Sequence, residues 1–124
     1  MNYSEKVIQN KIIEDLKDRG YWVMKTQGGV AGTPIGTPDI LACDSIGNFI
    51  AIEVKKIGGK LSNEQVHQLK KLSDNLASTY VTNDINFGFN IERNQNIEEK
   101  SNAKFDNTIT YQIYCGDIYE VIYD

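Results

Sequence analysis

The spacing of apolar residues predicts two amphipathic helices. From Ser4 to Arg19, the apolar residues that recur every three to four positions form one helical stripe: Ile8, Ile12, Ile13 and Leu16. Ser4 is suited to the N-cap of this helix, and Gly20 is suited to the position after its end. A second helix is predicted over Ser62–Leu76, with a core stripe of Leu61, Leu69, Leu72 and Leu76.

Short runs of β-branched, aromatic and other apolar residues predict strands on both sides of the second helix. Three runs precede this helix and one follows it: Tyr21–Thr26, Asp39–Cys43, Phe49–Lys56 and Thr79–Thr82. In the third run, Ile50, Ile52 and Val54 alternate with other side chains and form one apolar face. Residues 28–38 are rich in glycine, contain two prolines, and are predicted to be a loop.

The last third of the chain has a different composition. Residues 83–107 contain seven asparagines and few large apolar residues, which predicts irregular or inserted structure. Thr108–Tyr114 and Ile118–Tyr123 are predicted to close the chain as a hairpin around Gly116 and Asp117. The element order is then α-β-β-β-α-β plus a C-terminal β-hairpin, which indicates an α+β (α/β) fold with helices packed on a mixed sheet.

Length and composition limit the class of protein. A chain of 124 residues is expected to form one domain, and 40% hydrophobic with 24% charged residues is typical of soluble globular proteins. No apolar run reaches the roughly 18 residues of a membrane span. The first residues also lack a signal-peptide core, so we expect a cytoplasmic protein without membrane partners.

Charge and reactive side chains exclude several kinds of site. The net charge of −4 divides into +1 over residues 1–75 and −5 over residues 76–124, so a polyanion site is expected in the first part. His67 is the one histidine, which excludes a His-rich metal site and a pair of catalytic histidines. Cys43 and Cys115 form neither a metal-type cluster nor a disulfide framework.

The candidate chemistry lies in Asp39, Glu53 and Lys55. Glu53 and Lys55 project from the same face of one strand, but the position of Asp39 depends on the preceding turn. A three-residue loop over 45–47 with left-handed Gly47 would place Asp39 opposite Glu53. A two-residue loop over 46–47 would turn Asp39 to the other face.

The three-residue loop would create a metal site. Two adjacent carboxylates repel each other unless a divalent cation lies between them, and an oxygen-only ligand set suits Mg²⁺ or Mn²⁺. Lys55 could then act on water or on a phosphoryl group. The alternative is a solvated strand face. Gln65 is also open to two interpretations, since it could face this site or form a capping box with Ser62.

In combination these features resemble the PD-(D/E)XK nuclease superfamily, and in particular the small stand-alone VRR-NUC domains. The resemblance rests on a helix carrying Glu5, the Gly36-Thr-Pro-Asp39 motif, the Glu53-Val-Lys55 motif and Gln65. It covers residues 4–82, so we expect a single nuclease domain over 1–124 with its core at 4–82 and an extension at 83–124. The fold it implies is a restriction-endonuclease-like core.

The resemblance also implies roles for individual residues. Asp39, Glu53, the backbone carbonyl of Val54 and the helix acid Glu5 would bind the metal. Lys55 would be the catalytic lysine, with Gln65 as a supporting polar residue of the catalytic set. The remaining expected contacts are with the phosphates of the substrate, through backbone near glycines and through lysines: Gly28, Gly29, Gly36, Lys56 and Lys60.

The expected protein is a Mg²⁺-dependent (or Mn²⁺-dependent) DNA endonuclease that is selective for branched or Holliday-junction-like DNA. We expect it in the cytoplasm of a bacterial or phage-infected cell, as a homodimer whose interface uses the tail or an exposed sheet edge. One alternative is an RNase or a nucleotide-activated nuclease on the same fold. Another is a non-catalytic relative that binds nucleic acid or protein.

Overall fold

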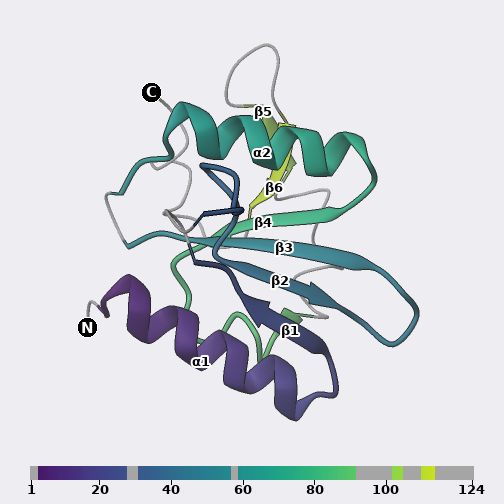
Figure 1. Ribbon diagram of the computed structural model, residues 1–124. Coiled ribbons are helices and arrows are strands. Elements are labelled where there is room, and N and C mark those ends of the chain that lie inside the picture. Colours follow the sequence, from purple (N-terminus) through teal and green to yellow (C-terminus); the bar gives the residue numbers. More distant parts are fainter. Residues whose placement is uncertain (1–2, 28–30, 57–58, 92–101, 105–109, 114–124) are drawn as a thin grey trace.

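Two helices and one six-stranded sheet make up the part of the chain described by this computed structural model, which covers residues 3–27, 31–56, 59–91, 102–104 and 110–113 (Figure 1). The elements, in chain order, are α1 (Glu5–Asp18), β1 (Trp22–Lys25), β2 (Ile40–Cys43), β3 (Phe49–Val54), α2 (Asn63–Asp74), β4 (Ser78–Thr82), β5 (Asn102–Lys104) and β6 (Thr110–Ile113). The predicted α+β fold class and the order of elements through β4 are confirmed.

The sheet is mixed, with strand order β1-β2-β3-β4-β6-β5. β1, β2 and β3 are antiparallel neighbours, whereas β4 runs parallel to β3 and to β6. Parallel neighbours need a long connection, and α2 is the crossover between β3 and β4.

The helices cover opposite faces of the sheet, as Figure 1 shows. The face under α1 contains the main hydrophobic cluster, made by helix, strand and loop residues: Ile8, Ile12, Leu16, Ile40, Ala42, Ile50, Ile52, Val54, Tyr80, Phe87 and Ile91. On the other face α2 contacts β4 and β6 and buries Leu69. Within the described residues, neither helix is long and apolar enough to cross a membrane.

The helix ends follow the sequence signals, with one exception. The Ser4 hydroxyl accepts from the amide of Val7, and Ser62 caps α2, as predicted. Leu76, predicted to belong to the core stripe, is instead 93% exposed with φ +70°. The helix ends at Asp74, so Leu76 falls in the left-handed position beyond the helix, where its side chain points away from the core.

The hydrophobic core extends beyond the predicted boundary at residue 82. Phe87 and Ile91 are fully buried, and the rings of Phe87 and Tyr80 meet edge to face at 5.1 Å between centroids. A side chain on Gly88 would lie 2.7 Å from the carbonyl oxygen of Ile12, so this segment packs tightly against α1. The segment has few large apolar residues, but Phe87 and Ile91 are enough to fill the space beside α1.

The predicted closing hairpin is partly wrong. β6 falls inside the predicted strand Thr108–Tyr114, but it pairs with β5, from the segment predicted to be irregular. The other predicted strand, Ile118–Tyr123, and the turn at Gly116 and Asp117 lie outside the described residues. β6 also pairs with β4, so it continues the core sheet.

Candidate functional site

The turn between β2 and β3 brings the two candidate carboxylates together. The amide of Asp44 donates to the carbonyl of Asn48 (3.2 Å), and Gly47 is left-handed with φ +89°. Ile40 then pairs with Ile52, so the preceding Asp39 lies opposite Glu53. The three-residue loop is confirmed, and the two-residue alternative is wrong.

Asp39 is held in place by both neighbouring strands. At the end of β1, Thr26 donates its amide to the carbonyl of Asp39 (2.9 Å) and its hydroxyl to the carbonyl of Pro38 (2.7 Å). From β3, the amide of Val54 donates to Oδ2 of Asp39 (2.9 Å). The role of Thr26 could not be predicted from sequence, because the partner of a strand-end hydroxyl depends on how the long glycine-rich loop folds back.

Glu53 is a buried carboxyl group with one oxygen unused. Its residue is 2% exposed, and Oε2 accepts from Nε2 of Gln65 (3.1 Å) and lies 3.9 Å from Nζ of Lys55. Oε1 is buried and has no hydrogen-bond partner. Burial, together with the negative charge of Asp39, raises the pKa of Glu53 to about 9.

The charge of Asp39 destabilises the ionised form of Glu53, whereas Asp39 is affected mainly by its own burial. Burial raises the pKa of Asp39, and the hydrogen bond from Val54 opposes this effect. A divalent cation between the two groups would offset the repulsion that raises the pKa of Glu53. The unused Oε1 and the oxygen-only donor set fit a hard divalent cation such as Mg²⁺ or Mn²⁺.

Gln65 fulfils both of the roles considered for it. Its Oε1 accepts from the amide of Ser62 (2.8 Å), and its own amide donates to the Ser62 hydroxyl (3.1 Å), which completes a capping box. Its Nε2 is the donor to Glu53. Because the cap fixes which end of the side-chain amide faces Ser62, it also fixes a donor toward Glu53.

Glu5 lies close to this pair without completing a cluster. Its Oε2 accepts from the amide of Lys56 (3.1 Å), just beyond the end of β3, and its charge raises the pKa values of both carboxyl groups. In the described segments, no three acidic, histidine or cysteine side chains converge in a way that could hold a metal. The metal-binding roles of Glu5 and of the Val54 carbonyl stay predictions.

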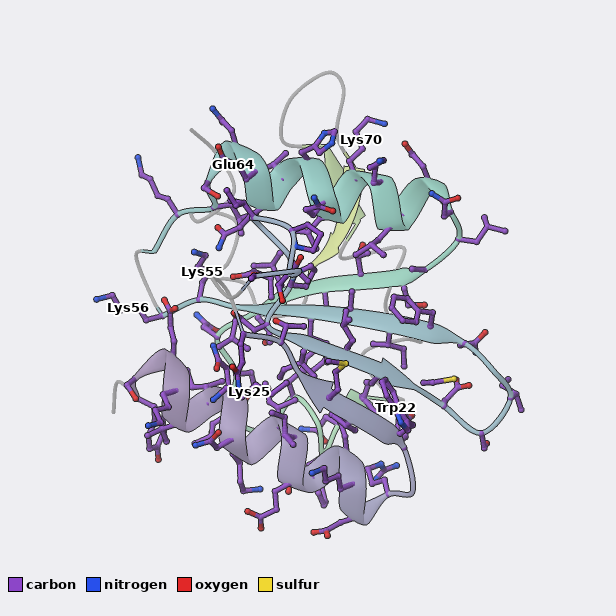
Figure 2. All side chains as sticks on the ribbon, in the orientation of Figure 1. Trp22, Lys25, Lys55, Lys56, Glu64 and Lys70 are labelled. Atoms are coloured by element: carbon purple, nitrogen blue, oxygen red, sulfur yellow. The ribbon has the colours of Figure 1, made fainter. Side chains whose placement is uncertain are left out.

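Only some of the residues predicted to contact substrate lie near the Asp39–Glu53 pair. Figure 2 shows Lys55 and Lys56 at the end of β3, with Glu64 at the nearby start of α2. The side chain of Lys55 is 13% exposed, whereas Lys56 and Lys60 are exposed. Gly36 faces α2, and Gly28 and Gly29 lie outside the described residues.

Comparison with solved structures identifies a known domain with a similar fold. A solved structure of a VRR-NUC domain is similar to this chain, with a TM-score of 0.61 and 22% sequence identity, over 72% of this chain and 94% of that one. No protein-family model matches the sequence, and no curated protein matches it. The chain therefore has a restriction-endonuclease-like α+β fold. More narrowly, this fold is that of a VRR-NUC domain, as the motifs predicted.

Proposed function

We propose that this protein is a Mg²⁺-dependent DNA endonuclease, with Mn²⁺ as an alternative cation, that prefers branched DNA. The observation that carries the proposal is the facing pair of Asp39 and Glu53, with a buried unpartnered oxygen, on a VRR-NUC fold. Two buried carboxyl groups this close can both be ionised only if a cation offsets their repulsion, which is why the pair supports a divalent-cation site.

Asp39, Glu53 and the carbonyl of Val54 would hold the cation. When bound, the cation supplies a Lewis acid and lowers the pKa of coordinated water. The chain itself prepares the site, because Val54 fixes Asp39 and Gln65 fixes Glu53 before any ligand enters. Groups that do not need to reorganise at the moment of reaction stabilise developing charge most effectively.

Lys55 is the proposed residue that acts on the phosphate or on the attacking water. Its backbone is fixed by the hydrogen bond from its amide to the carbonyl of Thr82 (3.0 Å). Its Nζ lies beside Glu53 in a partly enclosed position, where an ammonium interacts more strongly with phosphate oxygens than it does in water. The lysine thus donates to charge that grows on the phosphoryl group.

DNA is the proposed substrate, with phosphate contacts from Lys56, Lys60 and the glycine-rich loop. Lys55 and Lys56 emerge where β3 ends, so positive charge lies next to the carboxylate pair (Figure 2). An RNase, a nucleotide-activated nuclease or a non-catalytic binding relative are the alternative outcomes of the test below.

The proposed assembly is a homodimer through the β1 edge and the open sheet face beside it. In β1, β2 and β3 the register places six apolar side chains on the face that carries Glu53: Trp22, Met24, Leu41, Cys43, Phe49 and Ala51. Three of them, Trp22, Met24 and Phe49, are 39–57% exposed. Lys55 follows Glu53 on this face at the site end of β3, but the strand residues beside Trp22 include no lysine or arginine on it, which favours protein over DNA as the occupant of that part. Trp22 lies at the opposite end of the sheet from Lys55, so a partner there would leave the site open (Figure 2).

The decisive experiment is a cleavage assay on linear, flapped and four-way DNA and on RNA, with EDTA, Mg²⁺ or Mn²⁺. We expect cation-dependent cutting of branched DNA, which Asp39→Asn abolishes. Cutting of RNA alone would show that the substrate is RNA rather than DNA. If no substrate were cut, the alternative of a non-catalytic binding protein would be favoured. Light scattering of Trp22→Gln tests assembly, with the exposed Val7→Gln on α1 as control; a monomeric wild type contradicts the dimer.

A further inference from the structure

Gly36, three residues before Asp39, packs directly on the first turn of α2. A Cβ at this position would overlap the carbonyl group of Glu64 and would lie 2.8 Å from the amide nitrogen of Gln65. These are backbone atoms of a capped helical turn, so they cannot rotate aside as a flexible side chain would. The backbone at Gly36 is also left-handed, with φ +86°. The contact therefore requires glycine.

The contact joins the two segments that carry the candidate site. On one side, the amide and the hydroxyl of Thr37 both donate to the carbonyl of Pro34 (3.2 and 2.6 Å), and this turn presents Gly36. The chain then continues directly to Asp39. On the other side, Gln65 extends from the same turn of α2 and donates to Glu53.

We infer that Gly36 is a positioning residue: its missing side chain sets the distance between the Asp39 segment and the start of α2. A methyl group would push these segments apart, and Asp39 would move relative to the carboxyl group that Gln65 holds. Metal–ligand distances in proteins stay within about 0.2 Å of their typical values, so a shift of Asp39 would weaken a cation held by both carboxyl groups. This inference rests on the proposed function for its consequence, although the contact itself does not.

The test compares Gly36→Ala with Gly20→Ala. Gly20 has the same φ of +86° but open space around its Cβ position, so it controls for backbone strain without the contact. Three quantities are measured: amide hydrogen exchange at Gln65, affinity for Mn²⁺ alone by electron paramagnetic resonance, and DNA cleavage. We expect Gly36→Ala to lose at least about 10-fold in each, because about 1 Å of misplacement costs up to about 10²-fold in rate. Gly20→Ala should match the wild type.

Thr37→Val gives a second route if Gly36→Ala does not fold. It removes one hydrogen bond of the turn that presents Gly36 and adds no atom at the contact. We expect a smaller loss of Gln65 protection and of Mn²⁺ affinity. Wild-type exchange at Gln65 in the folded variants would overturn the inference. A wild-type protein that neither binds Mn²⁺ nor cuts DNA would instead refute the proposed function, while exchange at Gln65 would still decide whether Gly36 sets the spacing.

Discussion

Glu53 should make the cation-free protein less stable as the pH rises. Its pKa is about 9 in the folded chain against an ordinary value of 4.5, so the folded state keeps a proton that the unfolded chain releases. Stability from this group is fully present below about pH 4.5 and is lost as the pH rises toward about 9. Asp39 acts in the same direction, because its pKa is also raised.

The size of the effect follows from proton linkage. One proton held only by the folded state changes the free energy of unfolding by somewhat over 1 kcal/mol per pH unit, so a rise from about pH 5 to about pH 7 removes roughly 2 to 3 kcal/mol. The groups that face Glu53 are Asp39, Lys55, Glu5 and Gln65. Glu53→Gln replaces the protonated carboxyl with a neutral group of the same shape, so it should abolish most of this dependence.

Urea unfolding in EDTA, at several pH values between about 5 and about 8, measures the free energy of unfolding of the wild type and of Glu53→Gln. The wild type should lose stability across this range, and Glu53→Gln should be the more stable protein at the upper end. Mg²⁺ should then raise the stability of the wild type but not that of the variant. Glu64→Gln, at an exposed position in the first turn of α2, is the control for loss of a carboxylate. Parallel pH profiles for wild type and Glu53→Gln would refute the reasoning.

Three further outcomes are expected. Lys55→Met should lower turnover by roughly 10²-fold or more while Mn²⁺ affinity changes little. The control Lys70→Met loses only an exposed ion pair with Asp74 and should cut DNA at the wild-type rate. Unchanged turnover in Lys55→Met would contradict the proposed role of Lys55. Gln65→Glu keeps a side chain that can complete the cap of α2 but replaces the hydrogen-bond donor to Glu53 with an anion. Steady-state kinetics should show cleavage at least about 10-fold slower. Circular dichroism should show that the helix content is unchanged. Leu76→Gly should raise stability by roughly 1 kcal/mol in thermal unfolding, since Leu76 is exposed in a left-handed conformation; a lower melting temperature would contradict this.

The parts of the fold that local signals determine could be predicted from sequence. Ser4, Ser62 and Gln65 fix helix starts through hydrogen bonds to residues three positions away, and such contacts are visible in the sequence. The turn with Gly47 allowed two registers, and only the pairing of the strands distinguished between them. The carboxylate pair was thus predicted as one of two alternatives.

Other features depend on contacts between distant segments, which a single sequence does not specify. Burial of Phe87 against Tyr80 required the chain to return to α1 after β4. The partner of β6 was assigned wrongly because a hairpin signal favours the nearest strand in sequence. The contact of Gly36 with α2 was likewise not predicted, since many glycines of the same loop were equal candidates for phosphate contacts.

The position of β6 beside β4 has a consequence for any attempt to isolate a minimal fragment. A chain cut after residue 82 would lose Phe87 and Ile91, which would leave a void beside Ile12 in the main cluster. It would also lose β6, so that β4 would become an unpaired edge carrying apolar side chains, which is a template for aggregation. Proteases that cut after residue 91 should likewise destabilise the whole sheet. Residues 83–91 and β6, to which no sequence motif assigns a role, are therefore part of the fold on which the carboxylate pair depends.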